Sequence, residues 1–194
     1  MRFFNKYFFI GMGSGVLLTV AVIVVIVIIF IKTMSGNIEK MEATLSPPQF
    51  PEYSKLSIYG TADYSWSYRT LEGKELMFSE LKGKVVFINF WATWCKPCVA
   101  EMPAIQNLYD SLKNENIAFL LISNEDEKTI QKFMDEKRFT FPVYLRSKEL
   151  PKVFKTIGIP ATFIISRDGS VVFKHVGSAK WDDESCLSFI RGLM

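Results

Sequence analysis

Two cysteines, Cys95 and Cys98, directly follow a short apolar run. Residues 85–90 read Val-Val-Phe-Ile-Asn-Phe, which indicates a buried strand, and residues 94–98 read Trp-Cys-Lys-Pro-Cys. A Cys-x-x-Cys pair at a strand-to-helix junction is arranged for dithiol/disulfide chemistry. The free N–H groups and the positive dipole end of a helix N-terminus stabilise a thiolate. A second cysteine one turn later lies close enough to attack a mixed disulfide on the first.

The same cysteines could instead hold a zinc or copper ion. A four-ligand zinc site would have to recruit Cys186 and His175, the remaining cysteine and the single histidine. These two residues lack the close spacing of a ligand pair. Trp94 and Pro97 have no role in a zinc knuckle, whereas proline suits the first turn of a helix. The pattern favours redox chemistry without a metal or an organic cofactor, and a metal-handling module remains the alternative.

The N-terminal region holds a long uncharged stretch. Residues 7–31 carry no charge and are dominated by Val, Ile, Phe and Leu. At about 1.5 Å per residue, a helix of this length can cross a hydrocarbon core of roughly 30 Å. A cleaved signal peptide is the competing interpretation, but its apolar region is shorter, about 7–15 residues, and a small-residue cleavage site follows it. We therefore predict a retained transmembrane anchor over residues 1–32.

The remainder of the chain divides into a linker and one domain. Residues 33–53 are polar, and their three prolines favour an extended linker, while residues 54–194 carry the patterns of a compact domain. Lys and Arg are nearly balanced across the apolar stretch, so the short N-terminal stub is the reason to place the domain outside the cytoplasm. The net charge of +3 and the lack of a basic, aromatic-interleaved patch argue against nucleic-acid binding.

Within the domain, strand and helix patterns alternate. We expect a β-hairpin over residues 64–78, a helical turn capped by Ser79, and a long helix after Cys95 with Pro103 inside it, which should kink that helix. Further strands are expected at residues 85–90, 117–123, 141–145, 161–166 and 171–176, and further helices at 126–138, 151–154 and 182–193. This order predicts an α/β fold with a central sheet covered on both faces.

Ile159 and Pro160 precede the predicted strand at residues 161–165. The proline could open an edge strand with a trans peptide bond. Alternatively the bond is cis, and the turn exposes the backbone of Ile159 to a partner chain. Only about 5–6% of X–Pro bonds in folded proteins are cis, so the local sequence does not favour this geometry by itself.

Two further side chains have an ambiguous role. Glu101 lies three residues after Cys98 and could simply be solvated. A carboxylate near the cysteine pair would oppose thiolate formation and could relay a proton. Cys186 has apolar neighbours at the next helical turn, which indicates a buried and inert thiol.

With these sites in hand, the domain resembles the thioredoxin superfamily, and within it the membrane-anchored TlpA/ResA-type thiol-disulfide oxidoreductases. The residues that carry the resemblance are 81–84, 87–98, 101–103, 158–163 and 168–169. The resemblance implies a thioredoxin-like fold, with a central mixed sheet flanked by helices and an added N-terminal β-hairpin.

The resemblance also implies a role for each matching residue. Cys95 would be the exposed attacking thiol and Cys98 the buried resolving thiol. Glu101 would match an acidic residue that tunes the pair, and Pro160 would be a cis-proline facing the disulfide. The residues expected to contact a substrate are Trp94, Pro97, Ile159 and Pro160.

Two departures limit what the resemblance implies. Thioredoxin has a buried Asp in the strand before the cysteines, where this chain has Asn89, so the thioredoxin proton relay does not transfer. The P-x-x-x-T-x-x-C pattern of peroxiredoxins is missing, because no proline stands in the corresponding stretch before Cys95. We therefore expect no peroxidase activity.

The resemblance thus implies a monomeric thiol-disulfide oxidoreductase, held by one span in a bacterial cytoplasmic (inner) membrane with its domain on the extracytoplasmic, periplasmic side. We expect it to reduce protein disulfides and to be reduced in turn by a membrane dithiol electron donor. Relatives of this type act on apocytochrome c in cytochrome c biogenesis. The opposite direction, a disulfide-forming oxidant, stays open, because the sequence between the cysteines does not fix the reduction potential.

Overall fold

The computed structural model describes residues 18–33, 40, 44–146 and 149–194. The chain divides into two units, Met1–Lys40 and Met41–Met194. In the first unit, residues 18–33 are helical, and residues 1–17 of the predicted anchor lie outside the described residues. Within the described ranges, the structure contains no helix with both the length and the apolarity needed to span a bilayer.

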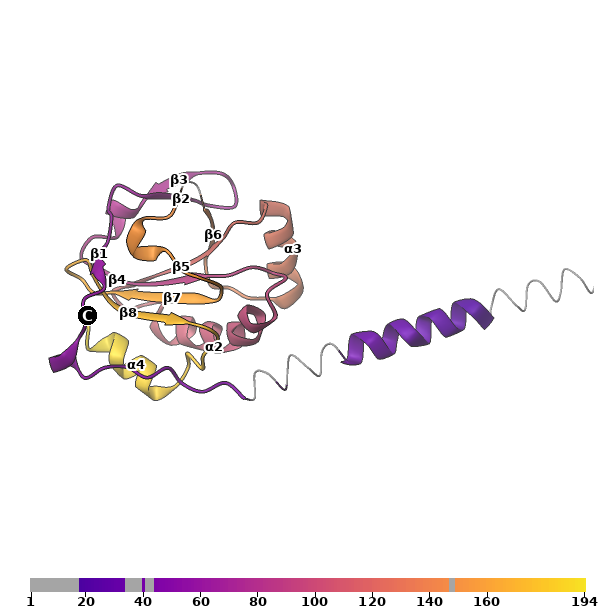
Figure 1. Ribbon diagram of the computed structural model, residues 1–194. Coiled ribbons are helices and arrows are strands. Elements are labelled where there is room, and N and C mark those ends of the chain that lie inside the picture. Colours follow the sequence, from indigo (N-terminus) through magenta and orange to yellow (C-terminus); the bar gives the residue numbers. More distant parts are fainter. Residues whose placement is uncertain (1–17, 34–39, 41–43, 147–148) are drawn as a thin grey trace, which may run out of the picture. The chain divides into compact units, whose positions relative to one another are not determined.

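The second unit is built on one mixed sheet of eight strands in the order β1-β8-β7-β4-β5-β6-β2-β3 (Figure 1). The strands are β1 (Gly60–Thr61), β2 (Ser67–Arg69), β3 (Glu75–Met77), β4 (Val85–Phe90), β5 (Ile117–Ser123), β6 (Val143–Arg146), β7 (Ala161–Ile165) and β8 (Ser170–Val176). The central strand β4 is parallel to β5 and antiparallel to β7. All six of its residues are buried, as its unbroken apolar sequence predicts.

The helices lie close to their predicted positions. They are α2 (Lys96–Leu112), α3 (Glu127–Lys137) and α4 (Glu184–Arg191), with short 3-10 helices η1 (Tyr53–Lys55), η2 (Phe78–Leu81) and η3 (Lys152–Phe154). Asp126 and Asp183 cap α3 and α4 by accepting backbone N–H groups of the first turn. Pro103 lies inside α2. The predicted Ser79 cap is wrong: η2 begins at the buried Phe78, and the Met77 N–H donates to the Glu80 side chain.

Both faces of the sheet are covered, but the long helices all lie on one of them. Val85 and Phe87 of β4 pack in the cluster that holds the buried side chains of α2, α3 and α4. Val86 and Ile88 point into a second cluster, formed with the hairpin, η2 and η3. The connections β4–α2–β5 and β5–α3–β6 step in the same direction along the sheet. Right-handed crossovers therefore place both helices on the same face.

The predicted hairpin is confirmed, with shorter strands than the sequence pattern indicates. β2 and β3 are antiparallel, and β2 joins the edge of the sheet beside β6. The hairpin therefore extends the sheet on the side away from β7 and β8.

Residues 50–53 of the predicted linker lie against the C-terminal helix. The Phe50 ring stacks on Phe189 of α4 with ring centroids 4.3 Å apart. The Tyr53 hydroxyl donates to the carbonyl oxygens of Ser188 and Phe189 at 2.9 and 2.6 Å. These contacts hold residues 50–53 against α4. This helix in turn packs on β8, where the ring of Phe173 contacts that of Phe189.

Candidate active site

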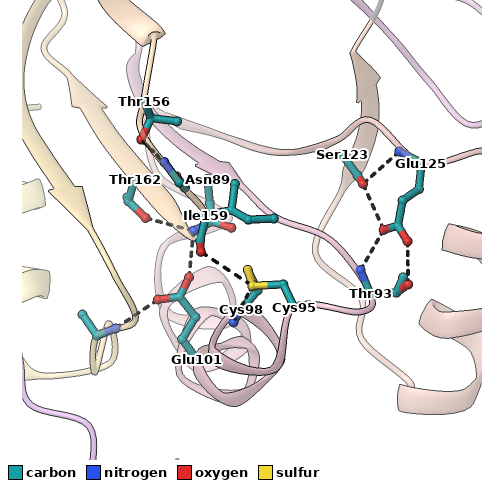
Figure 2. Close-up of a disulfide and its surroundings, with 12 residues drawn as sticks. Asn89, Thr93, Cys95, Cys98, Glu101, Ser123, Glu125, Thr156, Ile159 and Thr162 are labelled. Atoms are coloured by element: carbon teal, nitrogen blue, oxygen red, sulfur yellow. Dashed lines mark hydrogen bonds between the residues drawn. A yellow bond between two sulfur atoms is a disulfide. The ribbon is translucent and has the colours of Figure 1, made fainter.

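Cys95 and Cys98 form a disulfide at the N-terminus of α2 (Figure 2). Cys95 is the N-cap residue of the helix, and the backbone N–H of Cys98 donates to its sulfur at 3.3 Å. Pro97 occupies the first turn, as expected. When the disulfide opens, this N–H and the helix dipole favour negative charge on the Cys95 sulfur.

Cys95 is less exposed than the resemblance implies, whereas Cys98 is buried as expected. Cys95 is 5% exposed and Cys98 is 1% exposed, so Cys95 is the more accessible of the two but is nearly buried in the disulfide state. Its Sγ lies 3.8 Å from the carbonyl oxygen of Ile159. The preceding residue, Trp94, is 70% exposed. The surface above the disulfide is therefore made largely by neighbours of the cysteines and not by the sulfurs.

The Ile159–Pro160 peptide bond is cis, which resolves the alternative that the sequence left open. The bond immediately precedes β7, the antiparallel neighbour of β4. This position brings the carbonyl of Ile159 next to Cys95, as Figure 2 shows. The backbone at Ile159 can therefore contact a chain bound across the disulfide.

Glu101 is completely buried, so it is not a solvated surface residue. It lies one helical turn after Cys98 and thus on the same face of α2. Its Oε1 accepts a hydrogen bond from Asn89 Nδ2 at 2.9 Å. Its Oε2 accepts from the Ala179 backbone N–H at 3.0 Å and from the Trp181 indole N–H at 2.7 Å. The carboxyl group is therefore fixed below the disulfide by the central strand and by the loop before α4.

Burial raises the pKa of Glu101 to about 7, because desolvation disfavours its ionised form. The hydrogen bonds from Trp181, Ala179 and Asn89 favour the carboxylate and lower the pKa by a smaller amount. Glu101 is thus a proton-exchanging group whose midpoint lies near neutral pH, close to a redox-active pair.

Glu125 is a site residue that the sequence analysis missed. One of its oxygens accepts the backbone N–H of Thr93 and the other accepts the Thr93 hydroxyl, each at 2.7 Å. The Ser123 hydroxyl also donates to Glu125. Because β4 and β5 are parallel, their carboxyl ends meet at one edge of the sheet. A polar side chain just after β5 was the signal that could have indicated a partner for the loop before Cys95.

A groove of about 530 Å³ lies beside the disulfide. Trp94 and Ile159, two of the expected substrate-contacting residues, line it, whereas Pro97 and Pro160 are not part of its lining. Ile157, which also lines the groove, is fully exposed. A groove with exposed apolar side chains next to a disulfide suits a bound polypeptide.

Cys186 and His175 lie elsewhere. Cys186 is fully buried in α4, and burial, together with the charges of Asp183 and Asp182, raises the pKa of its thiol well above the usual range. His175 is in β8, with its ring edge-on to Trp181. Across the described ranges, no three or more His, Cys, Asp or Glu side chains are grouped to hold a metal ion.

Comparisons with known proteins agree with this geometry. A sequence profile of the AhpC/TSA family matches residues 61–174. Thiol-disulfide oxidoreductase ResA of Bacillus cereus is 34% identical over 136 residues, which cover 69% of this chain and 78% of the relative.

Solved structures show the same fold. A thiol:disulfide interchange protein of the thioredoxin family from Chlorobium tepidum is similar with a TM-score of 0.58 and 30% identity, over 67% of this chain and 95% of that one. StoA from Bacillus subtilis is similar with a TM-score of 0.50 and 27% identity, over 58% and 87% of the two chains. The α/β fold is therefore thioredoxin-like, and the chain belongs to the AhpC/TSA family, in which its relatives are ResA-type thiol-disulfide oxidoreductases.

Proposed function

We propose that this thiol-disulfide oxidoreductase reduces disulfides of other proteins on the extracytoplasmic side of a bacterial membrane, where residues 7–31 anchor it. The observation that carries the redox role is the Cys95–Cys98 disulfide at the N-terminus of α2, with the Cys98 N–H directed at the Cys95 sulfur. The support for the anchor is the uncharged apolar run itself, which has the length of a membrane span.

The proposed reaction starts from the reduced pair. The Cys95 thiolate attacks one sulfur of a substrate disulfide, the substrate S–S bond breaks, and the second substrate sulfur leaves as a thiolate that takes up a proton. Cys98 loses its proton and attacks the Cys95 sulfur. The bond between Cys95 and the substrate breaks, and the first substrate sulfur leaves as a thiolate that takes up a proton from solvent. Two electrons pass from the dithiol to the substrate, and the Cys95–Cys98 disulfide of the structure is the product state.

In this scheme Glu101 accepts the proton of Cys98. Its position one turn along the same helix face and its midpoint of about 7 suit this exchange, because a proton acceptor is most effective when its pKa is near the working pH. Trp94 and Ile159 line the groove in which the substrate chain is held. Pro97, in the first turn of α2, and the buried Pro160, which follows the cis bond, position the disulfide and the Ile159 carbonyl for that contact.

A continuing reaction requires the oxidised pair to be reduced again. We propose a membrane dithiol protein as the electron donor, since the domain is held at the membrane surface by its anchor. The ResA relatives are thiol-disulfide oxidoreductases, which favours this class of function. Apocytochrome c, the substrate suggested by the resemblance alone, is the one to test first.

Trapping tests the proposal. In cells that express the full chain, Cys98→Ala should accumulate mixed disulfides with partner proteins on Cys95, because the resolving thiol is gone. Cys95→Ala is the matched control and should trap none. The reductant role is supported if the trapped partners carry disulfides in cells that lack the protein and free thiols in cells that express the wild type. A pair that instead oxidises partner dithiols, with a reduction potential above that of the surrounding thiol pool, would reverse it.

A further inference from the structure

The two carboxyl oxygens of Glu101 have different kinds of partner. Oε2 accepts hydrogen bonds from the Ala179 backbone N–H and the Trp181 indole N–H. Neither group has a lone pair that could accept a hydrogen bond in return. Oε1 has one partner, the side-chain carboxamide of Asn89, which carries both a donor and an acceptor.

Only the nitrogen of the Asn89 carboxamide makes hydrogen bonds to the described residues. Its Nδ2 donates to Glu101 Oε1 and to the Thr162 hydroxyl oxygen, each at 2.9 Å. Its Oδ1 is buried and has no hydrogen-bond partner among the described residues. An unpaired buried carbonyl oxygen destabilises the folded state, because it loses its hydrogen bonds to water without gaining others.

We propose that the proton gained by Glu101 resides on Oε1 and that the Asn89 carboxamide makes a half-turn to accept it. A proton on Oε2 would face two N–H donors and would have no acceptor. A proton on Oε1 needs an acceptor, and a half-turn of the amide places Oδ1 where Nδ2 lies in the ionised state. Asn89 is therefore a positioning residue that serves both protonation states of Glu101.

Thr162 completes the second state. Its hydroxyl accepts from Nδ2 in the observed state, and a hydroxyl can equally donate. After the half-turn, Oδ1 accepts one hydrogen bond from protonated Glu101 and one from Thr162. The NH₂ group then takes the position of Oδ1, which offers no hydrogen-bond partner among the described residues, so the half-turn occurs only when protonation of Oε1 replaces an acceptor with a donor. The backbone does not have to move, because rotation about the bond between Cβ and Cγ of Asn89 exchanges Nδ2 and Oδ1.

Within the part of the chain that the structure describes, burial and hydrogen bonds shift the pKa of Glu101, and no charged side chain contributes to the shift. The groups next to Glu101 are neutral: Asn89 from β4, Thr162 from β7, and the Ala179 and Trp181 N–H donors from the loop before α4. From α2, the paired Cys95–Cys98 sulfurs do not titrate.

His175 of β8 is a titratable side chain in contact with one of these donors, Trp181. Its ring lies edge-on to that of Trp181, with centroids 5.7 Å apart. The pH response of Trp181 must therefore be separated from that of His175, and the second variant below provides that control.

The test uses the full oxidised chain in detergent micelles, labelled with ¹⁵N and ¹³C. The Glu101 carboxyl carbon, the Asn89 side-chain amide and the Trp181 indole N–H are followed by NMR across the Glu101 midpoint of about 7. The Asn89 amide signals should change with the same midpoint as Glu101, while the Trp181 N–H keeps its hydrogen-bonded shift. A Trp181 N–H that loses its hydrogen bond while Asn89 stays constant would put the proton on Oε2 and overturn the proposal.

Two variants sharpen the test. In Glu101→Gln, the introduced carbonyl oxygen must face the Ala179 and Trp181 donors, so its NH₂ group faces Asn89. The Asn89 amide signals of this variant should match the low-pH wild type at every pH, and signals that match the high-pH form would contradict the proposal. His175→Gln should leave the Asn89 titration in place; its loss would show that Asn89 follows His175 instead.

The inference rests on the proposed function in one respect: the proposed function makes Cys98 the source of the proton that Glu101 gains during turnover. Its placement is measured on the resting disulfide form, without a substrate. A failure of the trapping experiment would therefore leave the NMR result unaffected. A negative NMR result would leave the disulfide chemistry of Cys95 and Cys98 unaffected.

Discussion

Glu101 holds its charge at an energetic cost, because its side chain has no contact with solvent. In the unfolded chain the group is expected to titrate near its ordinary pKa of 4.5, whereas burial raises its pKa to about 7 in the folded protein. The folded state therefore binds this proton more tightly than the unfolded state. By linkage, the contribution of Glu101 to stability falls as the pH rises from about 4.5 to about 7 and is constant above that range.

Replacing Glu101 with Gln should remove this pH dependence. We expect the free energy of unfolding of Glu101→Gln, relative to the wild type, to rise from pH 5 to pH 8 by up to about 3 kcal/mol. Urea unfolding of both oxidised proteins at several pH values measures the difference, and the other titrating groups cancel in the comparison. If the difference in unfolding free energy stays constant over this range, ionisation of Glu101 does not destabilise the folded protein.

Among single residues, the sequence predicted the Cys95–Cys98 pair but not the side chains that surround it. Cys95, Cys98 and Pro97 lie in one contiguous motif whose helix N-terminus could be predicted from local chemistry. The burial of Glu101 could not be predicted in this way, because its donors Ala179 and Trp181 follow it by 78 and 80 residues. The cis bond before Pro160 was also open from local sequence, since its neighbours permit either geometry.

Among the elements, the loop between β4 and α2 depends on a contact from the next strand. Glu125, just after β5, binds both the N–H and the hydroxyl of Thr93, two residues before Cys95. Two parallel strand ends are thus tied together at the edge of the sheet where the disulfide lies. The geometry of Cys95 therefore depends on a side chain outside its own loop and helix.

Removing this contact should loosen the loop. Glu125→Ala should lower the free energy of unfolding by about 1–3 kcal/mol, because hydrogen bonds to a charged acceptor are lost. It should also speed hydrogen exchange at the Thr93 amide and change the rate at which a small dithiol reduces the disulfide. Glu127→Ala, at an exposed position in the first turn of α3, is the matched control. Equal exchange rates at Thr93 in the two variants would show that Glu125 does not hold the loop.

Element positions followed from sequence where the signals were local. β4 and β5 occupy the predicted residues because both are apolar runs, and the helix predicted over residues 126–138 is α3, within one residue at each end. The placement of the long helices on one face could not be predicted from local patterns. It depends on strand order, and the order β7-β4-β5-β6 results from pairings between distant segments.

Within the second unit, residues near its start pack against its C-terminal helix. Phe50 lies against both Phe173 of β8 and Phe189 of α4, and Tyr53 binds the last turn of the same helix. Cys186 is fully buried within α4 and is the only cysteine outside the disulfide. Its thiol therefore lies in a part of the core that both ends of the domain cover.

Cys186 should therefore report on unfolding of the whole domain. In the oxidised protein, alkylation of Cys186 in native buffer should be more than about 10³-fold slower than in denaturant, because the reagent must wait for an opening that costs most of the folding free energy. In the reduced protein, Cys95 should react first, since its sulfur is the more accessible of the pair. Mass spectrometry of peptides after timed alkylation measures each site separately. Labelling of Cys186 before Cys95 would contradict both assignments and would mean that α4 opens independently of the sheet.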